Sequence, residues 1–127
     1  MKDILLIVED DDAFREIVSS RFEQAGYPNH AVPTAEEALE WMHSASCYVI
    51  FSDLTLPGMN GIEFCRLIKA DYPLAVLYAM TGYTSIFELT DCREAGFEDY
   101  FTKPVDFSLL LKAAANASEK LNRWRLP

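Results

Sequence analysis

Short apolar runs and amphipathic stretches alternate along the whole chain. Two of the runs, residues 4–8 and 48–51, are continuously apolar, as in strands that are buried on both faces of a parallel sheet. Three further runs have the length of strands, at residues 30–32, 74–80 and 99–102. The pattern therefore predicts five strands, each followed by a helix.

Between the runs, apolar residues recur at a spacing of three and four, which is the period of a helix that packs one face on a core. The glycines at 26 and 96 are expected to stop two of these helices. The expected inward positions are Phe14, Ile17, Val18 and Phe22 in the first helix; Ala38, Leu39 and Met42 in the second; Phe64, Leu67 and Ile68 in the third; and Leu109, Leu110, Ala113 and Ala117 in the last.

Helix starts are marked by two capping-box patterns, in which a Ser or Thr is followed three residues later by Glu. They are Thr34 with Glu37 and Ser85 with Glu88. Acidic residues are expected to cap two further helices at their N-termini: Asp11 or Asp12 in the first and Asp106 in the last, which should end near Leu121.

The regular order of strand and helix with short connections predicts an α/β fold, a doubly wound parallel sheet in a (βα)5 arrangement. The sequence shows no linker-like segment, internal repeat or low-complexity tract. We expect a single domain over residues 1–127, with a short tail at 122–127.

Composition narrows the function classes. The formal net charge is −9, which argues against nucleic-acid binding by this chain itself. No apolar run approaches the ~20 residues of a membrane span, and the N-terminus has no secretory pattern. Three cysteines, Cys47, Cys65 and Cys92, lack metal-ligand spacing and fit a reducing cytoplasm. A cytoplasmic protein without a membrane partner is expected.

Chemically useful residues stand where the predicted strands end. Glu9 and Asp10 follow the first strand, Asp53 ends the third, and Lys103 follows the fifth. Because the carboxyl ends of parallel strands meet at one edge, these side chains are expected to lie together. Three converging carboxylates repel one another unless a cation separates them, and oxygen ligands suit Mg²⁺, with Mn²⁺ as a possible substitute. The backbone carbonyl of Thr55 offers a further oxygen ligand.

The same edge carries groups suited to phosphoryl oxygens. Thr81 supplies a hydroxyl, Lys103 a positive charge, and Gly82 lets an anion approach the backbone closely. Together with the nucleophilic carboxylate of Asp53, they predict an aspartyl-phosphate site. Taken alone, each residue also has an ordinary role: a turn start, a strand end, a surface charge.

At this point the sequence closely resembles the receiver domain of two-component response regulators, over essentially all its residues. The resemblance is carried by the acidic pair Glu9–Asp10, by Asp53 before the segment Leu-Thr-Leu-Pro-Gly-Met-Asn-Gly, by Thr81–Gly82, and by residues 100–104, Tyr-Phe-Thr-Lys-Pro. It implies a flavodoxin-like fold with strand order 2-1-3-4-5. It also implies a cis bond between Lys103 and Pro104.

The resemblance implies a role for each matching position. Glu9, Asp10 and Asp53 would surround Mg²⁺ with the Thr55 carbonyl. Asp53 would accept a phosphoryl group from the phosphohistidine of a sensor histidine kinase or a histidine phosphotransfer protein. The protein would then be no enzyme beyond its own phosphorylation and dephosphorylation.

The remaining implied roles concern the response to phosphorylation. Thr81 and Lys103 would bind the phosphoryl group, and Tyr100 would report its presence to the face formed by the fourth helix, fifth strand and fifth helix. Thr55 and Tyr83 would tune its lifetime, and a bulky Tyr83 predicts slow decay. The output domain or target, the kinase and the signal are not encoded in these motifs.

Three alternatives stay open at this stage. A degenerate receiver would act only as a phosphorylation-independent interaction module, although every chemical position is present. An aspartyl-phosphate hydrolase of the haloacid-dehalogenase type would need a second Asp two residues after the nucleophile, where this chain has Thr55. A flavin carrier would need a Ser/Thr/Gly phosphate cradle, whereas the segment 52–61 is led by an acid.

Overall fold

The structure, a computed structural model, describes residues 4–82 and 86–125. The described residues form five strands and five helices in strict alternation. The elements are β1 (Leu5–Val8), α1 (Asp12–Gln24), β2 (Asn29–Val32), α2 (Ala35–Met42), β3 (Val49–Asp53), α3 (Gly61–Asp71), β4 (Val76–Thr81), α4 (Ile86–Ala95), β5 (Asp99–Thr102) and α5 (Phe107–Arg125).

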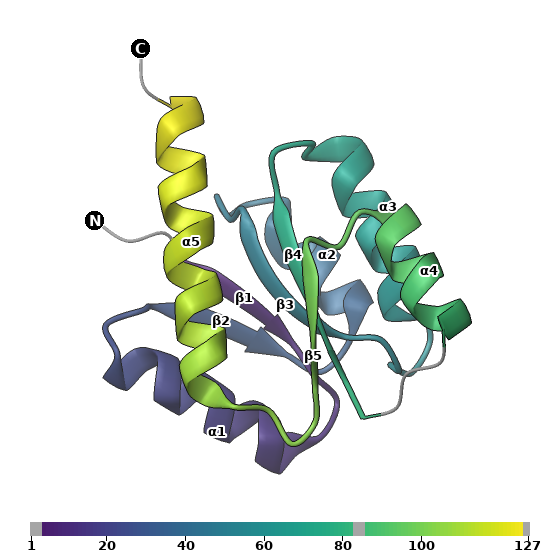
Figure 1. Cartoon of the computed structure of the whole chain (residues 1–127), viewed down its shortest axis with the longest axis horizontal. Helices are drawn as coiled ribbons and strands as arrows, with labels where there is room; N and C mark the ends of the chain where they lie inside the picture. The colour runs from purple at the N-terminus through teal and green to yellow at the C-terminus, as the bar shows by residue number, and fades with distance from the viewer. Residues whose placement is uncertain (1–3, 83–85, 126–127) are drawn as a thin grey trace.

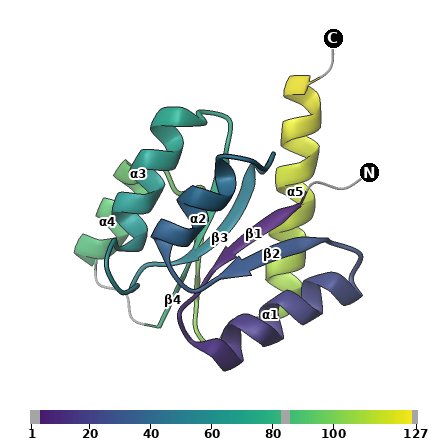
Figure 2. The same cartoon turned by 180° about the vertical axis from the view of Figure 1, so that it is seen from behind.

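The five strands form one parallel sheet in the order β2-β1-β3-β4-β5, which confirms the predicted fold class and strand order. Helices α1 and α5 cover one face, and α2, α3 and α4 cover the other (Figures 1 and 2). Each face buries its own apolar cluster. The sheet is therefore the middle of three layers, and all its strands point toward the same edge.

The predicted helix starts are largely confirmed. Asp11 is the N-cap of α1, where its side chain accepts from the Phe14 amide at 3.1 Å. Thr34 caps α2 by accepting from the Glu37 amide at 3.1 Å, and its hydroxyl also bonds the Glu37 carboxylate. The other proposed capping box begins at Ser85, which lies outside the described residues.

Three expected inward positions point outward instead. Ile17, Leu67 and Leu109 are exposed by 58, 44 and 45%. In each case the apolar neighbour one residue further along faces the sheet, so the buried stripe is narrower than the apolar spacing predicted. The fourth strand also begins at Val76 rather than at Leu74, which is half exposed.

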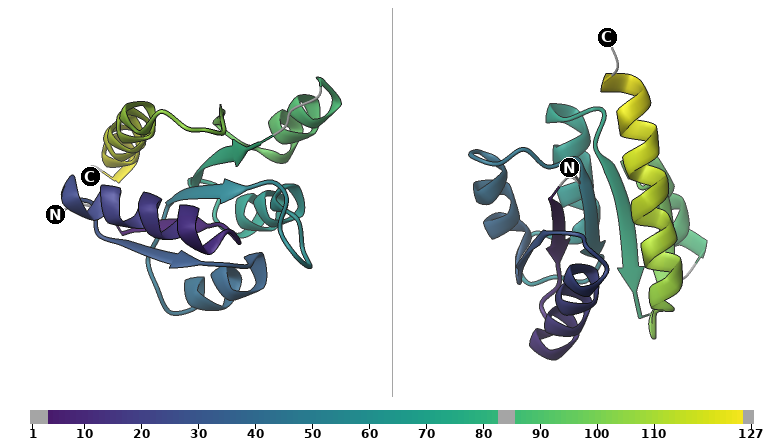
Figure 3. Two further views of the ribbon diagram at one scale, coloured as in Figure 1. Left: turned by 90° about the horizontal axis from the view of Figure 1, so that it is seen from below. Right: turned by 90° about the vertical axis from the view of Figure 1, so that its left-hand side faces the viewer.

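Helix α5 is longer than predicted. Among the residues whose burial is described, Leu121 is the last buried one, so the apolar stripe ends where expected, but the helix continues to Arg125. Residues 122–125 are helix-compatible in type and include no Gly or Pro, so nothing terminates the helix at Leu121. The right panel of Figure 3 shows these last turns projecting beyond the strands.

Candidate functional site

Three carboxylates meet at the carboxyl edge of the sheet. Glu9 and Asp10 follow β1, and Asp53 ends the neighbouring strand β3. One oxygen from each of the three lies within 4.8 Å of the others. Glu9 is fully buried and Asp53 is 6% exposed, whereas Asp10 lies at the surface. The structure therefore brings together the three residues that the sequence analysis grouped.

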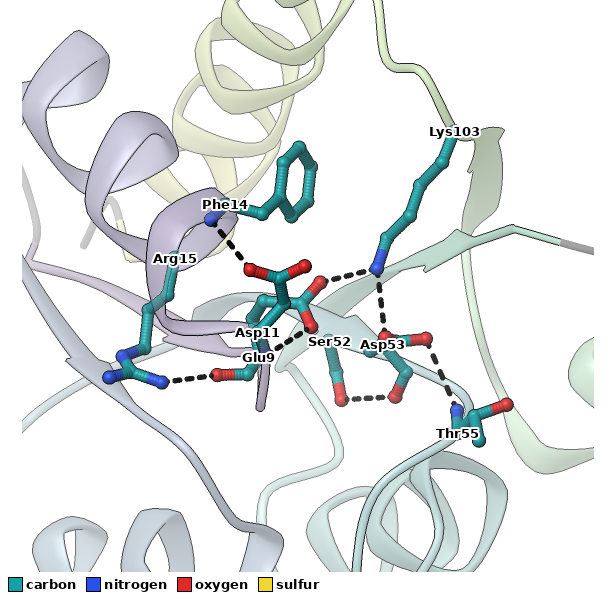
Figure 4. Close-up of polar contacts among 8 residues, drawn as sticks. All are labelled: Glu9, Asp11, Phe14, Arg15, Ser52, Asp53, Thr55 and Lys103. Atoms are coloured by element: carbon teal, nitrogen blue, oxygen red, sulfur yellow. Dashed lines mark hydrogen bonds and ion pairs between the residues drawn. The ribbon is translucent and has the colours of Figure 1, made fainter.

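Lys103 reaches this cluster from the end of β5. Its Nζ lies 2.6 Å from Glu9 Oε1 and 2.9 Å from Asp53 Oδ2, so one ammonium group joins two carboxylates (Figure 4). It also lies 4.8 Å from the centre of the Phe14 ring. The peptide bond from Lys103 to Pro104 is cis, as the resemblance implied.

The burial of these charges shapes their protonation. Desolvation by burial raises the pKa of Glu9 to about 7, against the opposing effects of the Lys103 ammonium and the Asp11 amide. Burial by itself would lower the pKa of Lys103, but the bonds to Glu9 and Asp53 outweigh it and raise that pKa overall. Lys103 thus stays positively charged beside the Asp53 carboxylate.

The backbone around Asp53 holds its carboxylate in place. The Thr55 amide donates to Asp53 Oδ1 at 3.2 Å, and the Ser52 hydroxyl donates to the Asp53 carbonyl at 2.9 Å (Figure 4). Gly61 opens α3 directly against this backbone, because a Cβ there would lie 2.2 Å from the Asp53 carbonyl oxygen. Only glycine permits this close approach.

The predicted phosphoryl-binding residues stand on the next strand. Thr81 ends β4 and is 3% exposed, and Gly82 follows it with open space where a side chain would lie. Tyr83 lies outside the described residues, so its predicted effect on lifetime stays a prediction. Tyr100 pairs with Ala79 in the sheet register and thus shares a face with Thr81, but its side chain is 41% exposed.

Sequence reasoning missed one cation at this site. Arg15 of α1 donates to the Glu9 carbonyl at 2.9 Å (Figure 4). It also pairs with Asp12 at 2.6 Å, and the two contacts together fix the loop that carries the acids. The three-residue spacing from Asp12 to Arg15 was the available local signal. The bond to Glu9 depends on how the loop turns, which no local pattern reveals.

The residues present fit a hard divalent cation. A group of three carboxylate oxygens at one edge of the sheet is the donor chemistry that Mg²⁺ prefers. Among the described residues, no helix is long and apolar enough to cross a membrane.

Comparison with known proteins agrees with this geometry. The model of the response regulator receiver domain matches residues 5–115. A cyclic di-GMP phosphodiesterase of Thermotoga maritima is 36% identical over 84% of this chain, which spans only 28% of that protein. Response regulator protein FleR of Pseudomonas aeruginosa is 33% identical over 87% of this chain, which spans 24% of it.

Solved structures are similar along nearly their whole length. A CheY-like receiver domain protein from Methanospirillum hungatei superposes with a TM-score of 0.89 at 27% identity, covering 97% of this chain and 99% of that one. Chemotaxis response regulator CheY4 of Vibrio cholerae gives a TM-score of 0.84 at 27% identity, covering 92% and 99%. The chain therefore belongs to the response regulator receiver family, whose general function is phosphoryl transfer.

Proposed function

We propose that Asp53 is the phosphoryl acceptor of this receiver domain. The supporting observation is the cluster itself: Asp53 lies at a strand end with Glu9 and Asp10, and Lys103 lies 2.9 Å from its carboxylate. The donor is the phosphohistidine of a sensor histidine kinase or a histidine phosphotransfer protein, since receiver domains act with histidine kinases and output domains.

The chemistry asks for alignment and charge neutralisation. An Asp53 carboxylate oxygen attacks phosphorus as the bond from phosphorus to the donor histidine nitrogen breaks, and that nitrogen keeps the electron pair. Lys103, now bonded to Asp53 Oδ2, is near enough to follow the negative charge onto the phosphoryl oxygens. Glu9, Asp10, Asp53 and the Thr55 carbonyl would hold one Mg²⁺. When bound, that ion would offset charge on the same oxygens.

Release of the proton from the acid cluster is part of this proposal. Because burial raises the pKa of Glu9 to about 7, cation binding has to compete with a proton at that carboxyl group. Lys103 contacts two of the carboxylates that would hold the cation and offsets part of their negative charge.

The response is proposed to run through Thr81 and Tyr100 to the face made by α4, β5 and α5. The buried Thr81 hydroxyl lies at the acceptor edge, and Tyr100 lines a pocket of about 130 Å³ with Leu89 and Cys92 of α4. A phosphoryl group that draws Thr81 inward would favour a repacked Tyr100. Thr55 and Tyr83 are proposed to tune the phosphoryl lifetime.

We propose that residues 1–127 form a single receiver domain that works in the cytoplasm. Three buried free thiols fit that reducing compartment. The phosphodiesterase activity in the name of the Thermotoga relative belongs to a protein of which this chain spans about a quarter. We propose no turnover of other substrates, and neither nucleic acid nor membrane as a direct partner.

Phosphorylation by a small donor tests the acceptor. Acetyl phosphate with Mg²⁺ should add one base-labile phosphoryl group, detected as an intact mass increase. Asp53→Asn should abolish it. Asp71→Asn, which removes the same charge from the exposed last residue of α3, should leave it intact. Full labelling of Asp53→Asn would refute the assignment. A parent that accepts no phosphoryl group would favour the phosphorylation-independent interaction module.

A further inference from the structure

One contact joins helix α2 to the loop that follows the acceptor strand. Glu36, in the first turn of α2, accepts a hydrogen bond at its Oε2 from the Met59 amide at 3.0 Å. The two residues are 23 apart in sequence, so no helix or turn rule requires them to meet. The neighbouring Glu37 is bonded to Thr34 at the helix cap and does not compete for this amide.

The loop is shaped to receive the Glu36 carboxylate. Gly58 has a φ of +73°, which an L side chain rarely adopts. A Cβ added at Gly58 would lie 2.5 Å from Glu36 Oε2, so the space beside the glycine is filled by this carboxylate. The positive φ therefore favours glycine next to the bonded amide, and a side chain there would displace the Glu36 carboxylate.

The same loop orients the acceptor. It begins after Asp53 and is closed where the Gly61 amide donates to the Leu54 carbonyl at 2.9 Å. Near its start, the Thr55 amide holds Asp53 Oδ1. The contact at Met59 therefore attaches the middle of a loop whose first residues contact the acceptor carboxylate. The Met59 amide, as the largest cause, lowers the pKa of Glu36, so the carboxylate is ionised at neutral pH.

We propose that Glu36 is a positioning residue for phosphorylation, acting on the backbone of residues 54–60. The inference rests on the proposed function of Asp53 and adds a residue on another helix to it. By fixing the Met59 amide, Glu36 limits the positions open to the Thr55 amide and carbonyl. Loss of this contact loosens the cation site and the acceptor together, without removing any group that touches the phosphoryl oxygens.

Three variants test the contact itself. Glu36→Ala removes the acceptor, Glu36→Gln keeps an oxygen for the Met59 amide, and Glu40→Ala removes the same charge from an exposed position of the same helix. Amide hydrogen exchange at Met59 should speed up about three- to ten-fold in Glu36→Ala, the range expected for one lost hydrogen bond. It should stay close to the parent in the other two variants.

The functional arm uses Mg²⁺ titration and the initial rate with acetyl phosphate. In Glu36→Ala the Mg²⁺ affinity and the initial phosphorylation rate should each fall about three- to ten-fold. Both quantities should recover in Glu36→Gln and stay unchanged in Glu40→Ala. Gly58→Ala should cause a similar loss, and its further effect in the Glu36→Ala background should be smaller, because both changes break one contact.

The outcomes separate the two ideas. A parent that takes up no phosphoryl group on Asp53 refutes the proposed function, and the exchange of the Met59 amide still reports on the contact. Equal Met59 exchange in parent and Glu36→Ala overturns the contact. Faster exchange with unchanged Mg²⁺ affinity and rate overturns the positioning role.

Discussion

The carboxyl edge of the sheet around Glu9, Asp53 and Thr81, which is the proposed acceptor edge, and strand β5 are built differently. Every residue of β1, β3 and β4 is buried, whereas in β5 Phe101 is half-buried and the other three residues are exposed. Glu9, Asp53 and Thr81 are polar groups inside the first region, and Tyr100 stands 41% exposed in the second. Dense burial fixes the chemical groups, and sparse burial leaves the neighbouring strand with less free energy opposing a rearrangement. One sheet thus carries a densely buried site beside a more exposed strand, which suits the proposed response.

Ion pairs make the same contrast. Lys103 pairs with Glu9 at 2.6 Å, where the carboxylate is fully buried. Lys120 of α5 pairs with Glu98, just before β5, at 2.7 Å, but both side chains are 46% exposed. The distances are nearly equal, so the surroundings decide the energy. Water screens the exposed pair, and removing one partner of the buried pair leaves charge without compensation.

Substitution of the two lysines should therefore give the largest contrast. Lys103→Met should lower the free energy of unfolding of the metal-free protein by roughly 3 kcal/mol, because it strands the buried carboxylates. Lys120→Met should lower it by about 0–1 kcal/mol. Urea unfolding in a metal chelator measures both. Mg²⁺ should restore part of the Lys103→Met loss, because a cation replaces the missing charge. Equal losses in the two variants would contradict the contrast between the regions.

The sequence predicted much of the acceptor edge because strand ends are encoded locally. The apolar runs before Glu9 and Asp53 and the turn residues after them placed both carboxylates at one edge. The exposure of Ile17 and Leu109 was not predictable in this way, because apolar spacing does not give the width of the face that the sheet covers.

The remaining contacts of the site depend on tertiary structure. Arg15 meets the Glu9 carbonyl, and Glu36 meets the Met59 amide, only after loops and helices have packed. Arg and Glu are residue types that commonly occupy exposed helix positions, so their presence at 15 and 36 does not mark a contact. Their partners are backbone groups, which every residue carries, so the sequence gives no chemical signal for the choice.

Tyr78 joins β4 to helix α5 and gives a pH test. It lies on β4, and its hydroxyl donates to the Ala113 carbonyl of α5 at 3.0 Å. Burial, the largest cause, raises the pKa of Tyr78 from 10.0 to about 12. The folded protein thus holds this proton more tightly than the unfolded chain. Its stabilising contribution is complete below pH 10 and is lost as the pH rises toward 12.

By pH 12 this loss should reach roughly 2–3 kcal/mol for Tyr78. Tyr78→Phe should remove this part of the alkaline dependence, while lowering the free energy of unfolding at neutral pH by about 1 kcal/mol through the lost hydrogen bond. Urea unfolding at a series of pH values measures both effects. An unchanged alkaline slope in Tyr78→Phe would show that this side chain does not hold α5 in the manner described.

Thr81→Ala should separate phosphorylation from response. The variant should still accept a phosphoryl group on Asp53 but lose the hydrogen bond that favours the rearranged β5, worth roughly 1.5–3 kcal/mol, or ten-fold or more in population. Amide chemical shifts of residues 86–103 with and without a beryllofluoride mimic measure this. The parent should show large changes and the variant small ones. Equal changes in both proteins would mean that the response follows another route.

Two serines of α5 give the smallest effect, with opposite signs. The Ser118 hydroxyl oxygen is buried and has no hydrogen-bond partner among the described residues, so its desolvation is uncompensated. Ser118→Ala should raise the free energy of unfolding by about 1 kcal/mol, helped by the higher helix propensity of Ala. Ser108, in the first turn, instead bonds Asp106 through its hydroxyl at 2.7 Å, and Ser108→Ala should lower that free energy by about 0.5–1 kcal/mol.

Both serines lie outside the acceptor cluster, so the phosphorylation rates of the two variants should match the parent. A slower rate in Ser118→Ala would show that the packing of α5 reaches the acceptor edge, and the separation of a fixed site from an adjustable strand would then fail.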